Sequence, residues 1–194
     1  MLSCVAQPSQ YDRCVTSTAA AEPAAWRELD SGTCSIARTL ALVGQPWTLL
    51  VLRDLFNGAR RFDELADHLG IARNVLTRRL AGLVEAGLVE RRSYREAGQR
   101  ARPEYRLTPA GRDLRPVLLA LMAYGDAHHA GADGPPMLLE HRGCGGTVQV
   151  RLECSKGHRI DPDTRLTSRT GPGARRRPAG WPATPTSSRF PQHD

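Results

Sequence analysis

Lysine, aromatic residues and long apolar runs are scarce in this chain of 194 residues. Lys156 is its single lysine beside 26 arginines, and aromatic residues make up 5% of the sequence. The longest uninterrupted apolar run, Val117–Tyr124, has eight residues, so no helix is expected to span a bilayer. The first twelve residues hold no Lys or Arg and no long apolar stretch, which argues against a secretory signal.

Disulfide and catalytic motifs are missing as well. The five cysteines are odd in number and scattered, so they form no disulfide framework. No nucleophile elbow, P-loop or dinucleotide fingerprint occurs. A thiol oxidoreductase would have to use Cys144 and Cys154, but the nine residues between them do not make a Cys-x-x-Cys motif. We therefore expect a cytoplasmic protein with mostly reduced thiols that does not act on membranes and is not an enzyme.

Positive charge is abundant and unevenly placed. Residues 31–112 carry fourteen Arg against eight acidic residues, a net charge of +6, and residues 165–194 carry +5. The stretches 1–30 and 113–164 each carry −2. A basic block of this kind suits a polyanion partner, although a solvated surface in an arginine-rich chain gives the same pattern.

The two ends of the chain differ from the middle in composition. Residues 1–30 lack a sustained apolar period and are interpreted as a flexible arm. In residues 165–194, five Pro, three Gly and seven Ser or Thr make up half of the stretch, which predicts a disordered basic tail. The folded part then comprises a domain at 31–130 and a small β-hairpin, a degenerate zinc ribbon by its spacing, at 137–164.

Apolar spacing and turn residues divide the folded part into elements. Pro46 suits the first turn of a helix, and Asn57-Gly58 and Gly87 are stop signals. The expected elements are helices over 36–43, 46–56, 62–69 and 73–86, strands over 88–94 and 104–107, and a long helix from Pro109 to about His129. This order predicts a mainly α fold with a small β-hairpin wing: a winged helix-turn-helix, followed by a short C-terminal β-hairpin.

Six ordered blocks closely resemble the HxlR family of bacterial winged helix-turn-helix transcriptional regulators. The blocks are Cys34–Ala37, Gly44–Leu55, Arg61–Leu65, Asn74–Leu80, Glu85–Arg91 and Tyr105–Gly111. The resemblance covers about residues 33–128 and implies a homodimeric DNA-binding repressor or activator that dimerises through its first and last helices. The chain departs from the family at Pro46 and at Ala72-Arg73, where the lost N-cap side chain costs about 1 kcal/mol.

The helix over 73–86 is the expected recognition helix, which lies in the major groove of double-stranded DNA. Its inward residues are expected to be Val75, Leu76, Leu80, Leu83 and Val84. This phase turns Arg73, Asn74, Thr77 and Arg78 outward, where Arg suits guanine and Asn suits adenine. Arg79 is expected to one side, nearer the phosphates. The alternative is a merely solvated helix face.

The strand pair with its loop over 95–102 is the expected wing. Three arginines on or beside this loop are predicted DNA contacts: Arg95, Arg100 and Arg102. Arg91 and Arg92 also lie near the loop, but one of them is expected to pair with Glu85 or Glu90 instead.

Cys34 precedes the first helix, where a helix N-terminus favours the thiolate. The HxlR family commonly has a cysteine here, and in some members that thiol senses oxidants or electrophiles. Two interpretations stay open, a redox-responsive thiol and a small residue packed under the dimer interface. A small-molecule effector is the further alternative.

A second constellation combines His141-x2-Cys144 with Cys154-x3-His158. The two pairs lie nine residues apart and would meet across a hairpin formed around Thr147–Glu153, giving a Cys2His2 zinc site. The alternative is a plain hairpin without metal, since Gly157 stands where a ribbon would place its last cysteine.

The predicted function is sequence-specific DNA binding by a transcriptional regulator. We expect Leu118, Leu121, Met122 and Gly125 of the last helix, with Ile36 and Leu40, to pack against a second protomer. Two-fold symmetry then predicts an inverted-repeat operator with half-sites roughly 34–36 Å apart. The alternative function is a winged-helix adaptor that binds protein instead of DNA.

Overall fold

The computed structural model describes residues 26–94 and 102–178. The described residues fall into two compact units, one formed by 26–34 with 165–178 and the other by 35–94 with 102–164. Each unit is described by itself.

The smaller unit joins the end of the expected arm to the expected tail. Short 3-10 turns occupy Trp26–Glu28 and Ser31–Thr33. The N–H of Asp30 donates to the carbonyl of Arg175 at 2.8 Å, and the N–H of Arg177 donates to the carbonyl of Glu28 at 2.8 Å. Glu28 also forms a 3.0 Å ion pair with Arg176. No local sequence pattern indicates this pairing, because it joins segments almost 150 residues apart through backbone groups.

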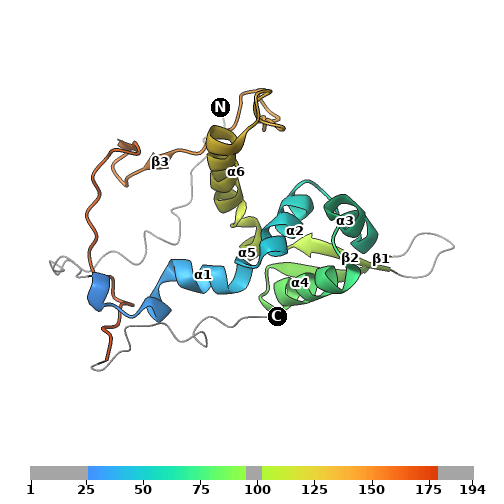
Figure 1. Cartoon of the computed structure of the whole chain (residues 1–194), viewed down its shortest axis with the longest axis horizontal. Coiled ribbons are helices and arrows are strands. Elements are labelled where there is room, and N and C mark those ends of the chain that lie inside the picture. The colour runs from blue at the N-terminus through green and yellow to red at the C-terminus, as the bar shows by residue number, and fades with distance from the viewer. Residues whose placement is uncertain (1–25, 95–101, 179–194) are drawn as a thin grey trace, which may run out of the picture. The chain divides into compact units, whose positions relative to one another are not determined.

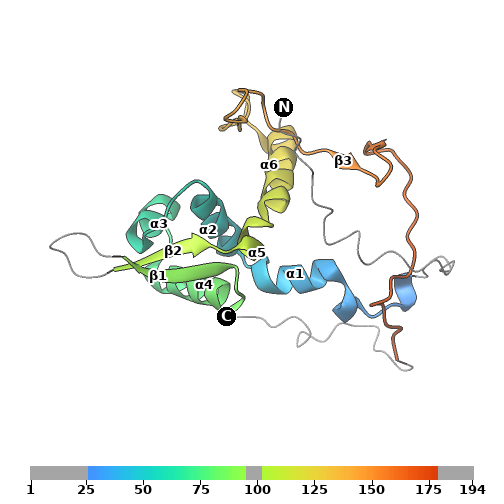
Figure 2. The same ribbon diagram turned by 180° about the vertical axis from the view of Figure 1, so that it is seen from behind.

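The larger unit holds a winged helix, residues 35–112, followed by a helical arm, which is the helix over 115–129 (Figures 1 and 2). Its helices are α1 (Ser35–Val43), α2 (Pro46–Phe56), α3 (Phe62–Leu69), α4 (Arg73–Glu85), α5 (Pro109–Arg112) and α6 (Arg115–His129). Strands β1 (Val89–Tyr94) and β2 (Arg102–Leu107) form an antiparallel hairpin between α4 and α5, with Val89 opposite Leu107 and Tyr94 opposite Arg102. The predicted fold class is confirmed.

The core of the winged helix lies between α2, α3, α4 and the hairpin. Leu52, Leu65, Leu76 and Leu80 are at most 1% exposed. These positions are the apolar ones at helical spacing, so burial of one face of each helix places the three helices around a common centre. Gly70 ends α3 with φ of 59°, a left-handed conformation that allows the tight turn into α4.

The predicted long last helix is wrong at one point, because the chain breaks between α5 and α6. Pro116 is the cause: it lacks an N–H, and its ring would clash with the carbonyl of Arg112 four residues earlier. Gly111 holds the short α5 against the hairpin. A Cβ at Gly111 would lie 2.0 Å from the backbone oxygen of Leu88, so only glycine fits there.

The segment after α6 forms two small turns instead of one hairpin around Thr147–Glu153. The first turn pairs Glu140 with Thr147 and is closed by the N–H of Val148 donating to the carbonyl of Leu139 at 2.7 Å. The second pairs β3 (Leu152–Glu153) with β4 (Arg159–Ile160). The expected strand is therefore divided between two different partners.

No single helix in the described residues is long and apolar enough to cross a membrane. By length and composition alone, α1 and α2 would pass as a pair, with an 80° bend between them.

Candidate nucleic-acid interface

The exposed face of α4 is the one that the apolar spacing predicted. Leu76, Leu80 and Leu83 are buried in the core, and Val75 is half-buried against it. The exposed side chains include the four expected outward residues: Arg73, Asn74, Thr77 and Arg78. Val84 was expected inside but is 37% exposed, whereas the neighbouring Leu83 is 1% exposed and turns to the core.

Arg73 ties the two helices of the helix-turn-helix together. Its guanidinium pairs with the Asp63 carboxylate at 2.9 Å and lies 4.7 Å from the ring centroid of Phe62. Ala72 supplies no side-chain cap to α4, as the sequence predicted. The side chains of both partners are exposed, so this ion pair adds little to the stability of the fold. The Arg73 guanidinium can therefore leave Asp63 for a nucleic-acid acceptor at a low cost in free energy.

The neighbouring polar groups of α4 differ in how they are held. The Thr77 hydroxyl donates to the carbonyl of Arg73 at 2.8 Å, and the Asn74 side-chain oxygen accepts from the N–H of Val75 at 2.9 Å. Both side chains are exposed. Arg79 is half-buried, and its Nε has no hydrogen-bond partner in the described part of the chain. This position beside the exposed face agrees with its expected location.

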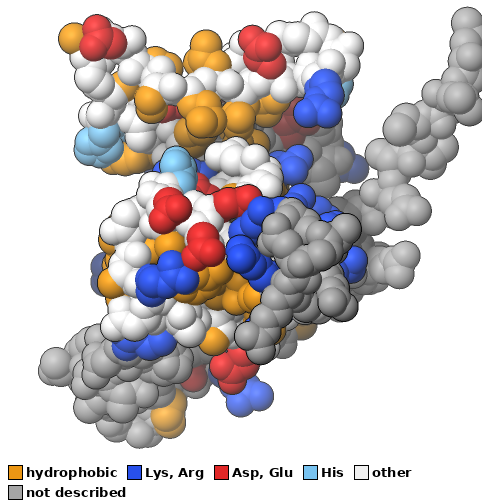
Figure 3. All heavy atoms as spheres, turned by 90° about the vertical axis from the view of Figure 1, so that its right-hand side faces the viewer, with side chains coloured by type: hydrophobic (Ala, Val, Ile, Leu, Met, Phe, Trp, Pro, Cys, Tyr) orange, Lys and Arg blue, Asp and Glu red, His pale blue; other side chains and the backbone are white. Residues whose placement is uncertain are grey.

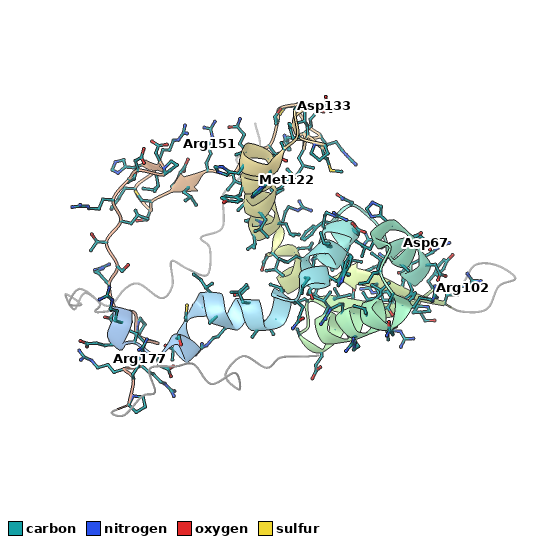
Figure 4. All side chains as sticks on the ribbon, in the orientation of Figure 1. Asp67, Arg102, Met122, Asp133, Arg151 and Arg177 are labelled. Atoms are coloured by element: carbon teal, nitrogen blue, oxygen red, sulfur yellow. The ribbon has the colours of Figure 1, made fainter. Side chains whose placement is uncertain are left out.

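The wing carries exposed arginines on both strands. Arg92 pairs with Glu90 at 2.7 Å, so one of the two candidate pairings exists. Arg91 is exposed, as is Arg102, which begins β2 at the base of the wing tip (Figure 4). Arg95 and Arg100 lie outside the described residues. Figure 3, which faces the wing side, shows basic and acidic side chains next to each other on this part of the surface.

Sequence reasoning missed Arg61, which joins the start of α3 to the wing. Its guanidinium lies 4.7 Å from the ring centroid of Tyr94 and contacts the Tyr94 hydroxyl. The backbone of Arg61 also forms an isolated antiparallel β-bridge with Glu104, and the carbonyl of Arg60 accepts from the N–H of Tyr105 at 2.8 Å. The Arg60-Arg61 pair directly before a helix with two acidic residues in its first turn was the available signal.

Glu64 fixes the entry into α3. Its carboxylate accepts from the backbone N–H groups of Arg60 and Arg61, both at 2.9 Å. These two hydrogen bonds lower the pKa of Glu64 below its usual value, because they stabilise the charged form.

A buried carboxylate on α2 contacts the first helix of the helix-turn-helix. Asp54 of α2 is 2% exposed, and its oxygens accept from Nε of Arg53 at 2.9 Å and contact Nδ1 of His68 at 2.7 Å. Because His68 belongs to α3, this contact joins α3 to α2. The sequence reasoning placed Asp54 in a helix without giving it a role.

Cys34 is exposed and forms no disulfide. It directly precedes Ser35, the first residue of α1, and its N–H donates to the carbonyl of Ser31 at 3.0 Å. Within a single chain the thiol is therefore accessible, rather than packed as a small core residue.

The four expected zinc ligands do not come together. His141 Nδ1 lies 3.3 Å from the Cys144 sulfur in the first turn, and the N–H of Cys154 donates to the carbonyl of His158 in the second. No group of three His, Cys, Asp or Glu side chains in residues 26–94 and 102–178 could hold a metal ion. The reason is the divided strand, which assigns each ligand pair to its own turn. The arrangement does not fit a Cys2His2 site, and zinc remains a prediction from the sequence.

Apolar side chains are exposed along both α1 and α6. Ile36 is 71% exposed and Leu40 is 53% exposed. On α6 the exposed apolar residues are Val117, Leu121 and Tyr124. Leu118 packs against the core of its own chain, and Met122 and Gly125 are half-buried. The packing of these residues against a second protomer stays a prediction.

The HxlR-like helix-turn-helix family model matches residues 42–132. An HTH-type transcriptional regulator of Mycobacterium tuberculosis (strain H37Rv) is 45% identical over 139 residues, which cover 72% of this chain and 87% of the relative. The match extends beyond the winged helix.

Solved structures that are similar to this one include PA1607 and PA1374. PA1607, assigned as a transcription factor, is 34% identical, with a TM-score of 0.61 over 69% of this chain and 93% of the other. PA1374 from Pseudomonas aeruginosa, also assigned as a transcription factor, is 41% identical, with a TM-score of 0.50 over 72% of this chain and 93% of the other. The family and these relatives are transcriptional regulators and not enzymes. The chain belongs to the HxlR-like helix-turn-helix family of transcriptional regulators.

Proposed function

We propose that the chain binds an inverted-repeat operator as a homodimer and places α4 of each protomer in the major groove. The exposed face of α4 carries this proposal. It presents Arg73, Asn74, Thr77 and Arg78 on a helix whose opposite face is fixed in the core. Such a face combines donors for guanine, an amide for adenine and a rigid support.

The exposed apolar residues of α1 and α6 support the dimer. Ile36 and Leu40 project from α1, and Val117 and Tyr124 project from α6, each at least 42% exposed. Apolar side chains clustered on a soluble protein's surface mark a protein interface. Sedimentation or size-exclusion measurements at micromolar concentration should give a dimer, and a protein that stays monomeric while binding DNA would contradict the proposal.

The variant Arg78→Ala tests the operator contact. Fluorescence anisotropy with DNA from the region upstream of the gene, compared with random DNA, should show a loss of about 1–3 kcal/mol in specific binding and a relaxed sequence preference. Arg151→Ala, an exposed arginine on the segment after α6, is the matched control. An equal loss on both DNAs would make Arg78 a phosphate contact. No binding of any DNA by the wild type would favour the protein-binding adaptor.

The wing should contribute contacts without sequence preference. Replacing Arg102, together with Arg95 and Arg100, by alanine should weaken binding to every DNA and flatten its salt dependence by about one unit of slope per lost phosphate contact. An unchanged slope would remove the wing from the interface.

We also propose a response to oxidants or electrophiles through Cys34, supported by its exposed thiol at the start of α1. A bulky or charged adduct beside α1 would disturb a dimer that uses this helix. Diamide or a quinone should lower the operator affinity of the wild type, while Cys34→Ser binds normally and ignores the reagent. Equal loss in both proteins would assign the effect to another thiol.

A further inference from the structure

A cavity of about 720 Å³ lies between the winged helix and the segment after α6. Its walls come from α2, from α6 and from residues 137–148. Its volume falls within the range of roughly 300–1,000 Å³ that small-molecule sites occupy.

The lining of this cavity selects for an apolar body. Ten of the fifteen lining residues are apolar, among them Phe56 from α2, Leu118 and Met122 from α6, and Met137 from the following segment. Figure 4 labels Met122 on α6 and Arg151 on the segment beyond it, outside the lining. A largely polar ligand would leave these walls unmatched.

The charges at the cavity select for a single negative group. Three arginines and one glutamate line it. The Arg53 guanidinium is already neutralised by Asp54 at 2.9 Å. The Arg115 guanidinium carbon lies 5.1 Å from the ring centroid of Phe56. Neither Arg115 nor Arg142 forms an ion pair with a described residue. Set against Glu140, these two arginines leave one positive charge in excess.

We infer that this cavity binds a small monocarboxylate with an aromatic or aliphatic body, and that this molecule is the effector of the regulator. The carboxylate pairs with Arg115 and Arg142, and the apolar body lies between α2 and α6. The inference rests on the proposed function for the effector role, but the binding itself requires no DNA.

The location of the cavity couples such a ligand to DNA binding. One wall, α2, packs against α3 and α4 of the helix-turn-helix. The other wall is α6, and none of its residues, all of which are described, is buried. Few contacts therefore fix the angle between α6 and α2. A ligand in contact with both helices favours one angle between them. Since α6 is also a proposed dimer element, this angle sets the spacing of the two recognition helices, and operator affinity changes with it.

The first experiment measures binding to the full chain without DNA. Displacement of the fluorescent anion anilinonaphthalene sulfonate compares naphthoate with the neutral naphthalenemethanol, which has the same ring system. Naphthoate should bind about tenfold more tightly, the effect of one charge-assisted contact. Equal binding of the two compounds overturns the assignment of an anion site.

Two variants and a matched control locate the site. Arg115→Gln and Arg142→Gln should each remove most of the preference for naphthoate, whereas Arg151→Gln, an arginine of the same segment outside the lining, should keep it. Met137→Trp, which places a large ring at an exposed lining position, should weaken both compounds alike. An unchanged preference in both arginine variants overturns the site. Naphthoate binding that disappears when the protein dimerises also overturns it, because a second copy then fills the cavity.

The second experiment adds operator DNA. Naphthoate should change the operator affinity of the wild type and of Arg151→Gln several-fold, and the change should be lost in the Arg115→Gln, Arg142→Gln double variant. If the wild type binds no operator DNA, the proposed function fails while the first experiment still decides the site. If naphthoate binds with arginine dependence but leaves operator affinity unchanged, the effector role is overturned.

Discussion

The winged helix and the helical arm that follows it differ sharply in how they satisfy their apolar residues. In the winged helix, Leu52, Leu65 and Leu80 are at most 1% exposed and belong to one buried core. In α6, no residue is buried, although its middle is as apolar as α2. Figure 3 shows hydrophobic side chains exposed in the upper part of the view, where α6 and the next segment lie.

The winged helix is therefore complete as a single chain, whereas α6 leaves apolar surface uncovered. The winged helix buries its apolar faces within one chain, so the core fixes the orientation of α4 without any bound partner. The arm leaves apolar surface for something else to cover, and the proposals assign its two sides to different occupants. Val117 and Tyr124 lie on the side proposed for a second protomer, and Leu118, Leu121 and Met122 line the side proposed for a ligand.

The largest expected effect contrasts one apolar residue from each region. Leu52→Ala removes a fully buried side chain and should lower the free energy of unfolding by about 2–5 kcal/mol in urea titrations. Val117→Ala, at a position 42% exposed and outside the cavity lining, should change the unfolding of the monomer by less than about 0.5 kcal/mol. Its effect should instead be a weaker dimer in sedimentation equilibrium. Equal losses from the two substitutions, measured where the protein is monomeric, would erase the contrast between the regions.

A pair of glycines sharpens the same contrast. Gly111→Ala places a Cβ 2.0 Å from the Leu88 carbonyl oxygen and should cost about 1–3 kcal/mol through forced backbone movement. Gly125→Ala meets no atom within 4 Å and should stabilise α6 by about 0.5–1 kcal/mol. Thermal unfolding of both variants measures the difference. Destabilisation by Gly125→Ala, together with a weaker dimer, would place Gly125 in the protomer interface.

The winged helix could be predicted because its signals are local. Pro46, Asn57-Gly58 and Gly70 mark helix ends through backbone geometry that needs no tertiary context. The apolar spacing of α4 gave the correct exposed face, since each turn of helix repeats the same orientation. Arg102 was placed in the loop, but it begins β2, one of the boundary positions that sequence patterns locate least well.

The remaining features depend on contacts that no local pattern encodes. The stacking of Arg61 on Tyr94 joins residues 33 positions apart, and the cavity requires three separate segments. The break before α6 was predictable in principle, because Pro116 excludes a continuous helix. The turns of His141 and Cys154 carry the expected ligand types, but the strand pairing that would bring them together is decided by tertiary contacts.

Asp54 gives the next effect in size, and it connects the two helices behind the interface. Asp54→Ala should lower the free energy of unfolding by about 1–3 kcal/mol, since it removes charge-assisted hydrogen bonds to Arg53 and His68. The loss stays below that for a fully buried ion pair, because the Arg53 and His68 side chains are 45% and 67% exposed and remain hydrated. A double-mutant cycle with His68→Ala in urea titrations isolates the α2–α3 contact. Additive effects would show that this contact contributes nothing.

Glu64 gives the smallest effect, which depends on pH. Its pKa is lowered in the folded state by the N–H groups of Arg60 and Arg61, so its contribution to stability is complete above the unfolded pKa. That contribution is lost as the pH falls through the lower folded pKa. Because the side chain is 49% exposed, Glu64→Gln should cost no more than about 1 kcal/mol at pH 7. Urea titrations of both proteins from pH 7 downward should converge in acid. A difference that persists or grows below the folded pKa would mean that the carboxylate charge is not what holds the start of α3 beside the wing.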